Sequence, residues 1–381
     1  MRHSTAPDSR SRPLSAAETE AFGRELDAVR QEIMASVGER EATYIRRVQA
    51  LVRYSEIGGR GLLCLGWLPP AWLTGTTLLS FSKIVDNMEL GHNVMHGQYD
   101  WMRDPSLVGN RYEWDSACPG DAWRHSHNYM HHTFTNIEGK DRDIGYGILR
   151  LTDDQKWNPG HLLQPLRAAM LAALFQWGVA MHDLEAEKVL QGKKSLRQLW
   201  QDFKPIGKKG VRQVAKDYVF FPLLAGPAAL PVLAGNATAN LTRNVWAFAI
   251  IFCGHFTDDA ETFSESVLEG ETRGQWYLRQ LKGSSNLEGG AFFHFMSGNL
   301  SHQIEHHLYP ELPALRYAEI ATRVRAICAR YGQHYDTGPF RTQFTGVLRR
   351  ILRYSLPTPL RTRHRRVSSE HLVTPTLATA A

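Results

Sequence analysis

Long apolar segments alternate with polar, histidine-bearing segments along this chain. Residues 61–81 are apolar but broken by a double proline, and a second apolar region covers residues 217–235 and 244–257 on either side of the polar sequence NATANLTR. A helix needs about 20 apolar residues to cross a bilayer. The first region provides two such helices only if they extend from about Val52 to about Leu90. The pattern predicts two helical hairpins that turn at the double proline and at NATANLTR.

The two hairpins predict an all-α integral membrane protein with four transmembrane helices and a cytosolic helical cap. In the alternative interpretation, both hairpins are buried inside a soluble helical bundle. Residues 162–181 are apolar as well. We expect them to form an interfacial helix, because a fifth span would place the later histidines on the opposite side of the membrane.

Basic residues indicate how the hairpins are oriented. Nine Lys or Arg residues lie from Asp183 to Lys216, whereas the turn at 235–243 contains only Arg243. Because positive residues stay on the cytoplasmic side, we expect residues 91–216 there and both turns outside. The histidine-rich segments then all lie at the cytoplasmic face of the membrane.

The two ends of the chain differ from its centre in composition. Ser15 and Glu18 form a capping box, which predicts a polar amphipathic helix that ends near Val37. The last residues contain Pro, Ser, Thr and basic residues without periodicity, which is typical of disorder. We therefore expect a polar tail and helix at 1–45, one main domain at 46–350 and a basic C-terminal tail at 351–381.

Cysteine usage and the first residues limit the class of protein. The 381 residues include only four cysteines, which are far apart and form no CxxC pair. This argues against a thiolate zinc site and a disulfide framework, and it fits a reducing compartment. The first residues contain no apolar core of a signal peptide. We expect no nucleic-acid partner.

Histidines occur in three clusters. The sequences GHNVMHG, WRHSHNYMHHTFTN and SHQIEHH contain nine of the 17 histidines, namely His92, His96, His125, His127, His131, His132, His302, His306 and His307. Histidines at i and i+4 share one face of a helix, and the second member of a doublet lies about 100° further round. A doublet therefore suits two neighbouring targets. One such cluster alone is most often a solvated helix face, but three clusters with two doublets predict two metal ions.

The number and type of ligands favour iron. Imidazole binds Zn, Cu, Fe and Ni, but zinc is redox-inactive and usually takes four ligands. Eight or more histidines exceed the need of one ion, and the HExxH motif of zinc hydrolases is absent. Two iron ions with O2 as co-substrate fit best.

The sequences GHNVMHGQYDWM, WRHSHNYMHHTFTN and FHFMSGNLSHQIEHHLYPELP together resemble the three histidine boxes of the membrane fatty acid desaturases. The similarity covers about residues 50–330 and is closest to the bacterial acyl-CoA desaturases. The QIEHHLYP form is also shared with front-end desaturases. The resemblance implies four membrane spans beneath a cytosolic cap with a di-iron centre. It also implies a reaction that uses O2 and two electrons to make a cis double bond in an acyl chain.

The resemblance also implies the metal ligands, which are His92, His96, His127, His131, His132, His255, Gln303, His306 and His307. His255 matches an extra ligand of related enzymes. In the third box, spacing alone favours His302, because His302, His306 and His307 repeat the spacing of the second box. The resemblance favours Gln303, since the family also uses a QxxHH form. We therefore assign Gln303 to the metal and His302 to its surroundings.

Further residues are candidates to orient the imidazoles through their second ring nitrogen. These are His125, His302, Asp258, one turn after His255, and Glu89, three residues before His92. For the two carboxylates, a solvated surface position is equally compatible with the sequence. Single histidines elsewhere, including His182, are interpreted as structural.

The resemblance predicts the partners and the substrate. No HPGG heme motif and no GxGxxG motif after a strand occurs, so electrons must come from a separate ferredoxin-like one-electron carrier with an NAD(P)H reductase. We expect Δ9 desaturation of a saturated acyl-CoA by a multi-pass protein of the bacterial inner membrane whose active site faces the cytoplasm. A phospholipid-linked desaturase or a hydroxylase is the alternative within the family, and a membrane metal carrier is the alternative outside it.

Overall fold

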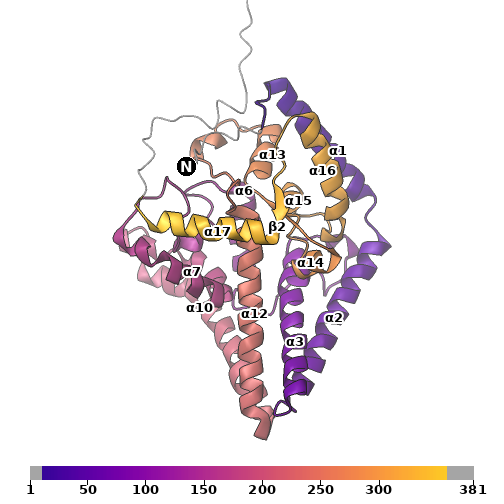
Figure 1. Ribbon diagram of the computed structural model, residues 1–381, viewed down its shortest axis with the longest axis vertical. Coiled ribbons are helices and arrows are strands. Elements are labelled where there is room, and N and C mark those ends of the chain that lie inside the picture. The colour runs from indigo at the N-terminus through magenta and orange to yellow at the C-terminus, as the bar shows by residue number, and fades with distance from the viewer. Residues whose placement is uncertain (1–10, 358–381) are drawn as a thin grey trace, which may run out of the picture.

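Helices make up almost all of the structure, a computed structural model that describes residues 11–357. Four helices form a tapering stem, and other helices form a cap over its wide end (Figure 1). The stem consists of α2 (Glu39–Leu63), α3 (Pro69–Val85), α10 (Leu196–Val214) and α12 (Ala229–His255). α3 packs against both α2 and α12 and thereby joins the two sides of the stem.

The cap is built from segments at both ends of the described chain. Its main helices are α1 (Ala16–Ala35), α13 (Arg273–Lys282), α14 (Ala291–Met296), α15 (Gln303–Leu308), α16 (Tyr317–Arg330) and α17 (Phe340–Ser355). Two short parallel strands, β1 (Asn286–Glu288) and β2 (Thr337–Pro339), pair within it. α1 packs against α13 and α16, while α17 lies across α12 (Figure 1).

Short helical segments connect the stem and the cap. They are α4 (Asn93–Met95), η2 (Asp100–Met102), α5 (Gly120–Trp123), α6 (His132–Phe134), η4 (Gly145–Gly147), η5 (Pro159–Leu163), η6 (His182–Leu184), α9 (Glu187–Leu190), η9 (Glu265–Leu268) and η10 (Ala314–Arg316).

The predicted capping box at the start of α1 is confirmed. The backbone N–H of Glu18 donates to Ser15 Oγ (3.3 Å), and the Ser15 N–H donates to Glu18 Oε2 (2.8 Å). These reciprocal bonds satisfy backbone donors that the first turn of a helix leaves free. Leu14 precedes the N-cap residue Ser15 and is buried in the hydrophobic core beneath α1, α13 and α16. Nearly all of the predicted C-terminal tail lies outside the described residues, and its first residues belong to α17.

The prediction of four transmembrane helices is wrong. Within residues 11–357, no helix combines the length and the apolar character that crossing a membrane requires. α3 has only 17 residues, and α2 carries charged residues, among them Arg53, Glu56 and Arg60, in the part where we expected an apolar span. α12 is longer, but polar residues occupy its middle.

The predicted turn at NATANLTR is also wrong, because this sequence lies inside α12. The chain turns earlier, at η8 (Gly226–Ala228), after α10, η7 (Ala215–Phe220) and α11 (Phe221–Leu224). The polar side chains that suggested a turn find buried partners. Asn236 Nδ2 donates to the Asp217 carbonyl (2.6 Å), and Asn240 Nδ2 donates to Asp217 Oδ2 (3.0 Å). The turn at the double proline is present between α2 and α3.

Asp217 is the centre of a buried ionic network in the stem. Its carboxylate lies 2.8 Å from Lys83 Nζ on α3 and 3.0 Å from Arg60 Nη2 on α2. The Lys83 and Asp217 side chains are only 4% and 2% exposed. Because buried charges are costly without partners, this network fixes how η7 packs against α2, α3 and α12.

The segment that we expected to be one interfacial helix is divided at Leu174 into α7 (Gln164–Ala173) and α8 (Phe175–Met181). α7 packs against α12 and α17. Ala168 and Leu171 are buried in the core cluster that includes these helices, whereas Leu166 and Met170 are exposed.

Candidate metal centre

Two of the three histidine clusters lie partly on π-helices, while His96 follows α4 and His132 begins α6. η1 (Asp86–His92) continues α3 and ends at His92, and η3 (Arg124–His131) carries His127 and His131. A π-helix is rare and occurs most often as a short insertion in an α-helix at a functional site. Each segment here directly joins α-helical residues on both sides. The wider turn of the π-helix therefore sets the direction in which these imidazoles point. The α-helical period of 3.6 residues does not predict this direction.

The remaining predicted ligands lie on α12 and α15. His255 is the last residue of α12, and α15 carries Gln303, His306 and His307. A tight turn before α15 contains Gly298 at φ 67°. A Cβ atom at this glycine would lie 2.4 Å from the Met88 carbonyl oxygen. Glycine is therefore required for the third cluster to approach η1.

The imidazoles converge in two groups. Ligand nitrogens of His92, His96, His127 and His306 all lie within 4.8 Å of one another, as do those of His131, His255 and His307. We call these the first and second imidazole groups. His132 adjoins both groups, because its nitrogen lies within 4.8 Å of those of His306 and of His307. The arrangement provides two adjacent positions for metal ions.

Hydrogen bonds to the outer ring nitrogens fix the tautomers in the second imidazole group. Nδ1 of His255 lies 3.2 Å from the Gly283 carbonyl oxygen, and Nδ1 of His307 lies 3.1 Å from Gln280 Oε1. Gln280 is held by its amide nitrogen, which donates to the His132 carbonyl (3.1 Å). Both oxygens only accept, so the protons are on Nδ1 and the lone pairs are on Nε2. These two Nε2 atoms are 3.1 Å apart, a contact that a cation would stabilise.

The first imidazole group also has free inner nitrogens. Nε2 of His92 lies 3.3 Å from Nε2 of His306. Among the described residues, Nε2 of His96, of His127 and of His132 is buried and has no hydrogen-bond partner. Unsatisfied buried polar atoms are costly. Ligand nitrogens of His96 and His127 converge with those of His92 and His306, so the first imidazole group fits a metal ion. The second group fits one through Nε2 of His255 and of His307.

Burial keeps most of these rings neutral, as metal binding requires. It lowers the pKa well below the usual value for His92, His96, His132, His255, His306 and His307. Burial also opposes a charge on His131, but Asp141 and Asp143 raise the pKa of that imidazole to about 9. A metal ion in the second imidazole group would therefore displace a proton from His131.

Two carboxylates that the sequence analysis did not identify contact the second box. Asp141 Oδ2 lies 2.9 Å from His131 Nδ1 and also accepts from the Asn136 N–H (2.8 Å). Asp143 Oδ2 lies 3.4 Å from His127 Nδ1. A carboxylate on the outer nitrogen orients a ligating imidazole. Both residues follow the second box closely in the sequence KDRD, and this proximity was the only available indication.

The structure places the predicted orienting residues elsewhere. Glu89 accepts hydrogen bonds from Tyr44 Oη (2.7 Å) and Asn299 Nδ2 (2.9 Å), so it links η1 to α2 and to the turn before α15. Asp258 is exposed and pairs with Arg349 (2.6 Å).

His125 and His302 belong to neither imidazole group. His125 is exposed, and its ring stacks with Tyr129. His302 precedes the first residue of α15, and its ring stacks with His294 at a centroid distance of 4.6 Å. The i/i+4 argument for His302 fails, because His302 is not within the helix.

Gln303 adjoins the second imidazole group. Its Nε2 is 2.9 Å from His255 Nε2, and its Oε1 is buried without a hydrogen-bond partner among the described residues. Gly254 makes room for this side chain, since a Cβ there would lie 2.8 Å from Gln303 Cγ. The amide can rotate to present either atom, so Gln303 can offer its oxygen to a metal ion.

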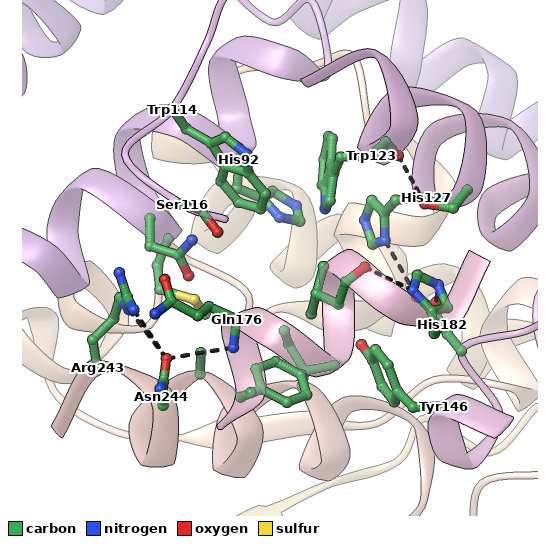
Figure 2. A pocket seen from close by; sticks show the side chains of 18 residues that line it. His92, Trp114, Ser116, Trp123, His127, Tyr146, Gln176, His182, Arg243 and Asn244 are labelled. Atoms are coloured by element: carbon green, nitrogen blue, oxygen red, sulfur yellow. Dashed lines mark hydrogen bonds and ion pairs between the residues drawn. The ribbon is translucent and has the colours of Figure 1, made fainter. Parts of the chain in front are cut away.

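A pocket adjoins the first imidazole group. Figure 2 shows His92, Trp123 and His127 on one side and Gln176, Arg243 and Asn244 on another. Its apolar lining comes from Met88, Phe175, Ala247 and Ile251, among others.

Known proteins share these sequence features. Residues 66–339 match the sequence model of the family described as fatty acid desaturase. The NADPH-dependent stearoyl-CoA 9-desaturase of Mycobacterium tuberculosis is 46% identical over 348 residues, which cover 90% of this chain and 82% of that protein. The sn-1 linoleoyl-lipid 6-desaturase of Synechocystis is 25% identical over 279 residues, which cover 71% and 76% of the two chains. The chain belongs to the fatty acid desaturase family.

Proposed function

We propose that this protein introduces a cis double bond at carbon 9 of a saturated fatty acyl-CoA, with O2 as the oxidant. The convergence of seven imidazoles into two adjacent groups is the observation that carries this proposal. The choice of acyl-CoA rests on the stearoyl-CoA 9-desaturase, which is 46% identical over 90% of the chain. The lipid-linked 6-desaturase is only 25% identical, so it gives weaker support to a phospholipid substrate.

Two iron ions fit the two imidazole groups. His92, His96, His127 and His306 would hold one ion, and His131, His255 and His307 would hold the other. Gln303 adjoins the second group, and His132 adjoins both groups through His306 and His307. Bound iron and O2 supply the oxidising power that cleavage of an unactivated C–H bond needs, which side-chain acids and bases do not have.

The residues of the chain supply orientation and a dry site. Asp141 holds the ring of His131 from its outer nitrogen. Met88, Phe175 and Ala247 offer apolar surface to the substrate, and each buried methylene contributes about 0.8 kcal/mol to its binding. Arg243 and Asn244 bond to each other (3.1 Å), so this wall of the pocket stays fixed and polar and limits where an alkyl chain can lie.

The electrons come from outside the chain in this proposal. A separate ferredoxin-like one-electron carrier with an NADPH reductase is consistent with the name of the mycobacterial relative, which is NADPH-dependent. Lys204, Lys208 and Arg212 are exposed on α10, and their charge would favour an acidic carrier or the phosphates of CoA.

We further propose that the protein works at a membrane with its metal centre facing the cytoplasm. Large apolar side chains are exposed on three stem segments, among them Ile57 on α2, Leu223 on α11 and Leu230 on α12. Leu223 is 73% exposed and Leu230 is 76% exposed. Contact with lipid would remove this surface from water.

The test is the fatty-acid profile of cells that express the protein together with a working electron donor. We expect new chains with a double bond at carbon 9, and none with the matched variant His306→Ala, which removes one imidazole. Hydroxy acids would instead indicate a hydroxylase, and an unchanged profile would contradict the proposal. Purified protein with labelled stearoyl-CoA or labelled phospholipid then identifies the form of the substrate.

A further inference from the structure

A histidine outside the three histidine clusters contacts the metal site through Asp143. His182 is the first residue of η6 and is only 8% exposed. Its Nε2 lies 3.0 Å from Asp143 Oδ1, while its Nδ1 lies 2.8 Å from the Val179 carbonyl oxygen. Because the carbonyl and the carboxylate oxygen both only accept, this arrangement needs a proton on each ring nitrogen. Nδ1 then donates to the Val179 carbonyl, which holds the ring in place, and Nε2 forms an ion pair with Asp143. Figure 2 shows His182 on the same side of the pocket as His127.

The other oxygen of Asp143 faces the two imidazole groups. Oδ2 lies 3.4 Å from Nδ1 of His127 in the first group and 3.7 Å from Nδ1 of His131 in the second. One carboxylate therefore connects His182 to a histidine of each group. The Asp143 backbone N–H also donates to Asp141 Oδ1 (2.9 Å), so the Asp141 carboxylate is held against the main chain of Asp143.

A second contact joins η6 to the segment 141–143, in addition to the contact between His182 and Asp143. The guanidinium of Arg142 donates from Nε (3.2 Å) and Nη2 (2.9 Å) to the backbone carbonyl of His182. Arg142 stands between Asp141 and Asp143 in the sequence. The main chain of η6 is thus fixed to this segment independently of the His182 side chain. Removal of the imidazole alone should leave the position of η6 largely unchanged.

We propose that His182 is a positioning residue of the metal centre, which holds Asp143 so that its carboxylate orients His127 and His131. The inference rests on the proposed function only in so far as the two groups bind metal. A residue that orients a ligand from outside the ligand shell typically changes metal affinity by about 10–100-fold. His182 would therefore change the metal affinity of both imidazole groups, although it supplies a ligand to neither.

The alternative is that His182 only fills space, since it also packs near the ring of Tyr146 at 5.2 Å. Val179→Ala is the matched control, because Val179 lines the same pocket and the substitution keeps the carbonyl that binds His182. Asp143→Asn and the double variant Asp143→Asn/His182→Ala then test whether His182 acts through Asp143.

The experiment measures the iron retained by the full-length protein at increasing chelator concentration, with thermal unfolding of each iron-free variant alongside. We expect His182→Ala to release iron at about 10–100-fold lower chelator concentration than the wild type, and Val179→Ala to behave like the wild type. The double variant should be no worse than Asp143→Asn. His182→Gln should recover part of the affinity, because its amide can still donate to Asp143.

Unchanged release from His182→Ala, or losses that add in the double variant, would overturn the inference. If His182→Ala does not fold, His182→Asn replaces it with the same expectation. If the wild type holds no iron, the proposed function fails, and the same series titrated with Co²⁺ alone still decides whether His182 positions the imidazoles.

Discussion

The Nε2 atoms of His255 and His307 lie 3.1 Å apart, although 52 positions separate the two residues in the sequence. His255 ends the stem helix α12, whereas His307 belongs to α15 in the cap. The second imidazole group therefore exists only when the cap is docked on the stem. A metal ion that binds this group binds the native state and not the unfolded chain, so it stabilises the docking.

Removal of the metal should therefore lower stability. Protein purified from iron-replete cells should contain about two irons per chain, as expected for a paired site. Iron at 100 times its Kd would stabilise the native state by about 2.7 kcal/mol. Differential scanning calorimetry before and after chelation should show a lower unfolding midpoint, and added Fe²⁺ should restore it. A midpoint that does not respond to iron would contradict this coupling.

The third box offers a comparison of two neighbouring residues. Gln303→Ala removes a side chain 2.9 Å from His255, so we expect lower iron content and lower turnover. His302→Ala removes a ring that stacks on His294 outside the imidazole groups and should keep both irons. The measurement is iron per chain and desaturation rate for the two variants. The opposite result would identify His302 as the ligand.

Glu89 should make stability depend on pH. Burial raises the pKa of Glu89 from its ordinary 4.5 to about 8, although Tyr44 and Asn299 donate hydrogen bonds to it. Between these two values the native state keeps a proton that the unfolded chain releases, so this residue lowers stability as pH rises. Glu89→Gln removes the effect. The stability of the variant relative to the wild type should increase from pH 5 to pH 8, by at most about 1.4 kcal/mol per pH unit.

Chemical unfolding at several pH values measures this difference. The remaining buried acids titrate in both proteins, so they cancel in the comparison. A difference in stability that is independent of pH would show that Glu89 is ionised in the native state.

The ionic network of the stem should be sensitive to the loss of Asp217. Asp217→Ala leaves the buried amine of Lys83 and the guanidinium of Arg60 without this carboxylate, which should cost about 3–5 kcal/mol of stability. Asp121→Ala is the matched control, because Asp121 also pairs with an arginine but is 96% exposed. We expect no measurable change from that control in denaturant unfolding. Equal effects of the two substitutions would contradict this role of the network.

Short sequence motifs were enough to predict the family and the start of the first helix, because both depend on residues close together in the sequence. The family was predicted from the three histidine boxes and is confirmed, as is the capping box of Ser15 and Glu18. The NATANLTR sequence misled us because isolated polar residues in an apolar region are typical of a turn. Their partners lie far away in the sequence. Asn240 bonds to Asp217, and Arg243 lies 3.5 Å from the carbonyl of Asp115, so only the packed helices reveal that these residues are buried.

The same reason explains the residues around the metal centre that we did not predict. Asp143 and His182 show no period and belong to no motif, and their relation to His127 depends on how η6 packs. The π-helical geometry of η3 was equally inaccessible, since its residues do not depart from ordinary helix-forming patterns.

The π-helix η3 makes the length of this segment critical for the imidazole groups. A π-helical insertion contains one residue more than the α-helix that it interrupts. Deletion of one residue within Arg124–His131 would let the segment return to an α-helix, and the helical residues on both sides could keep their positions. The side chains inside the segment would instead shift by up to one residue step, which is about 100° around the helix axis. His127 and His131 belong to different imidazole groups, so one deletion in this short segment would disturb both groups while the helix itself persists.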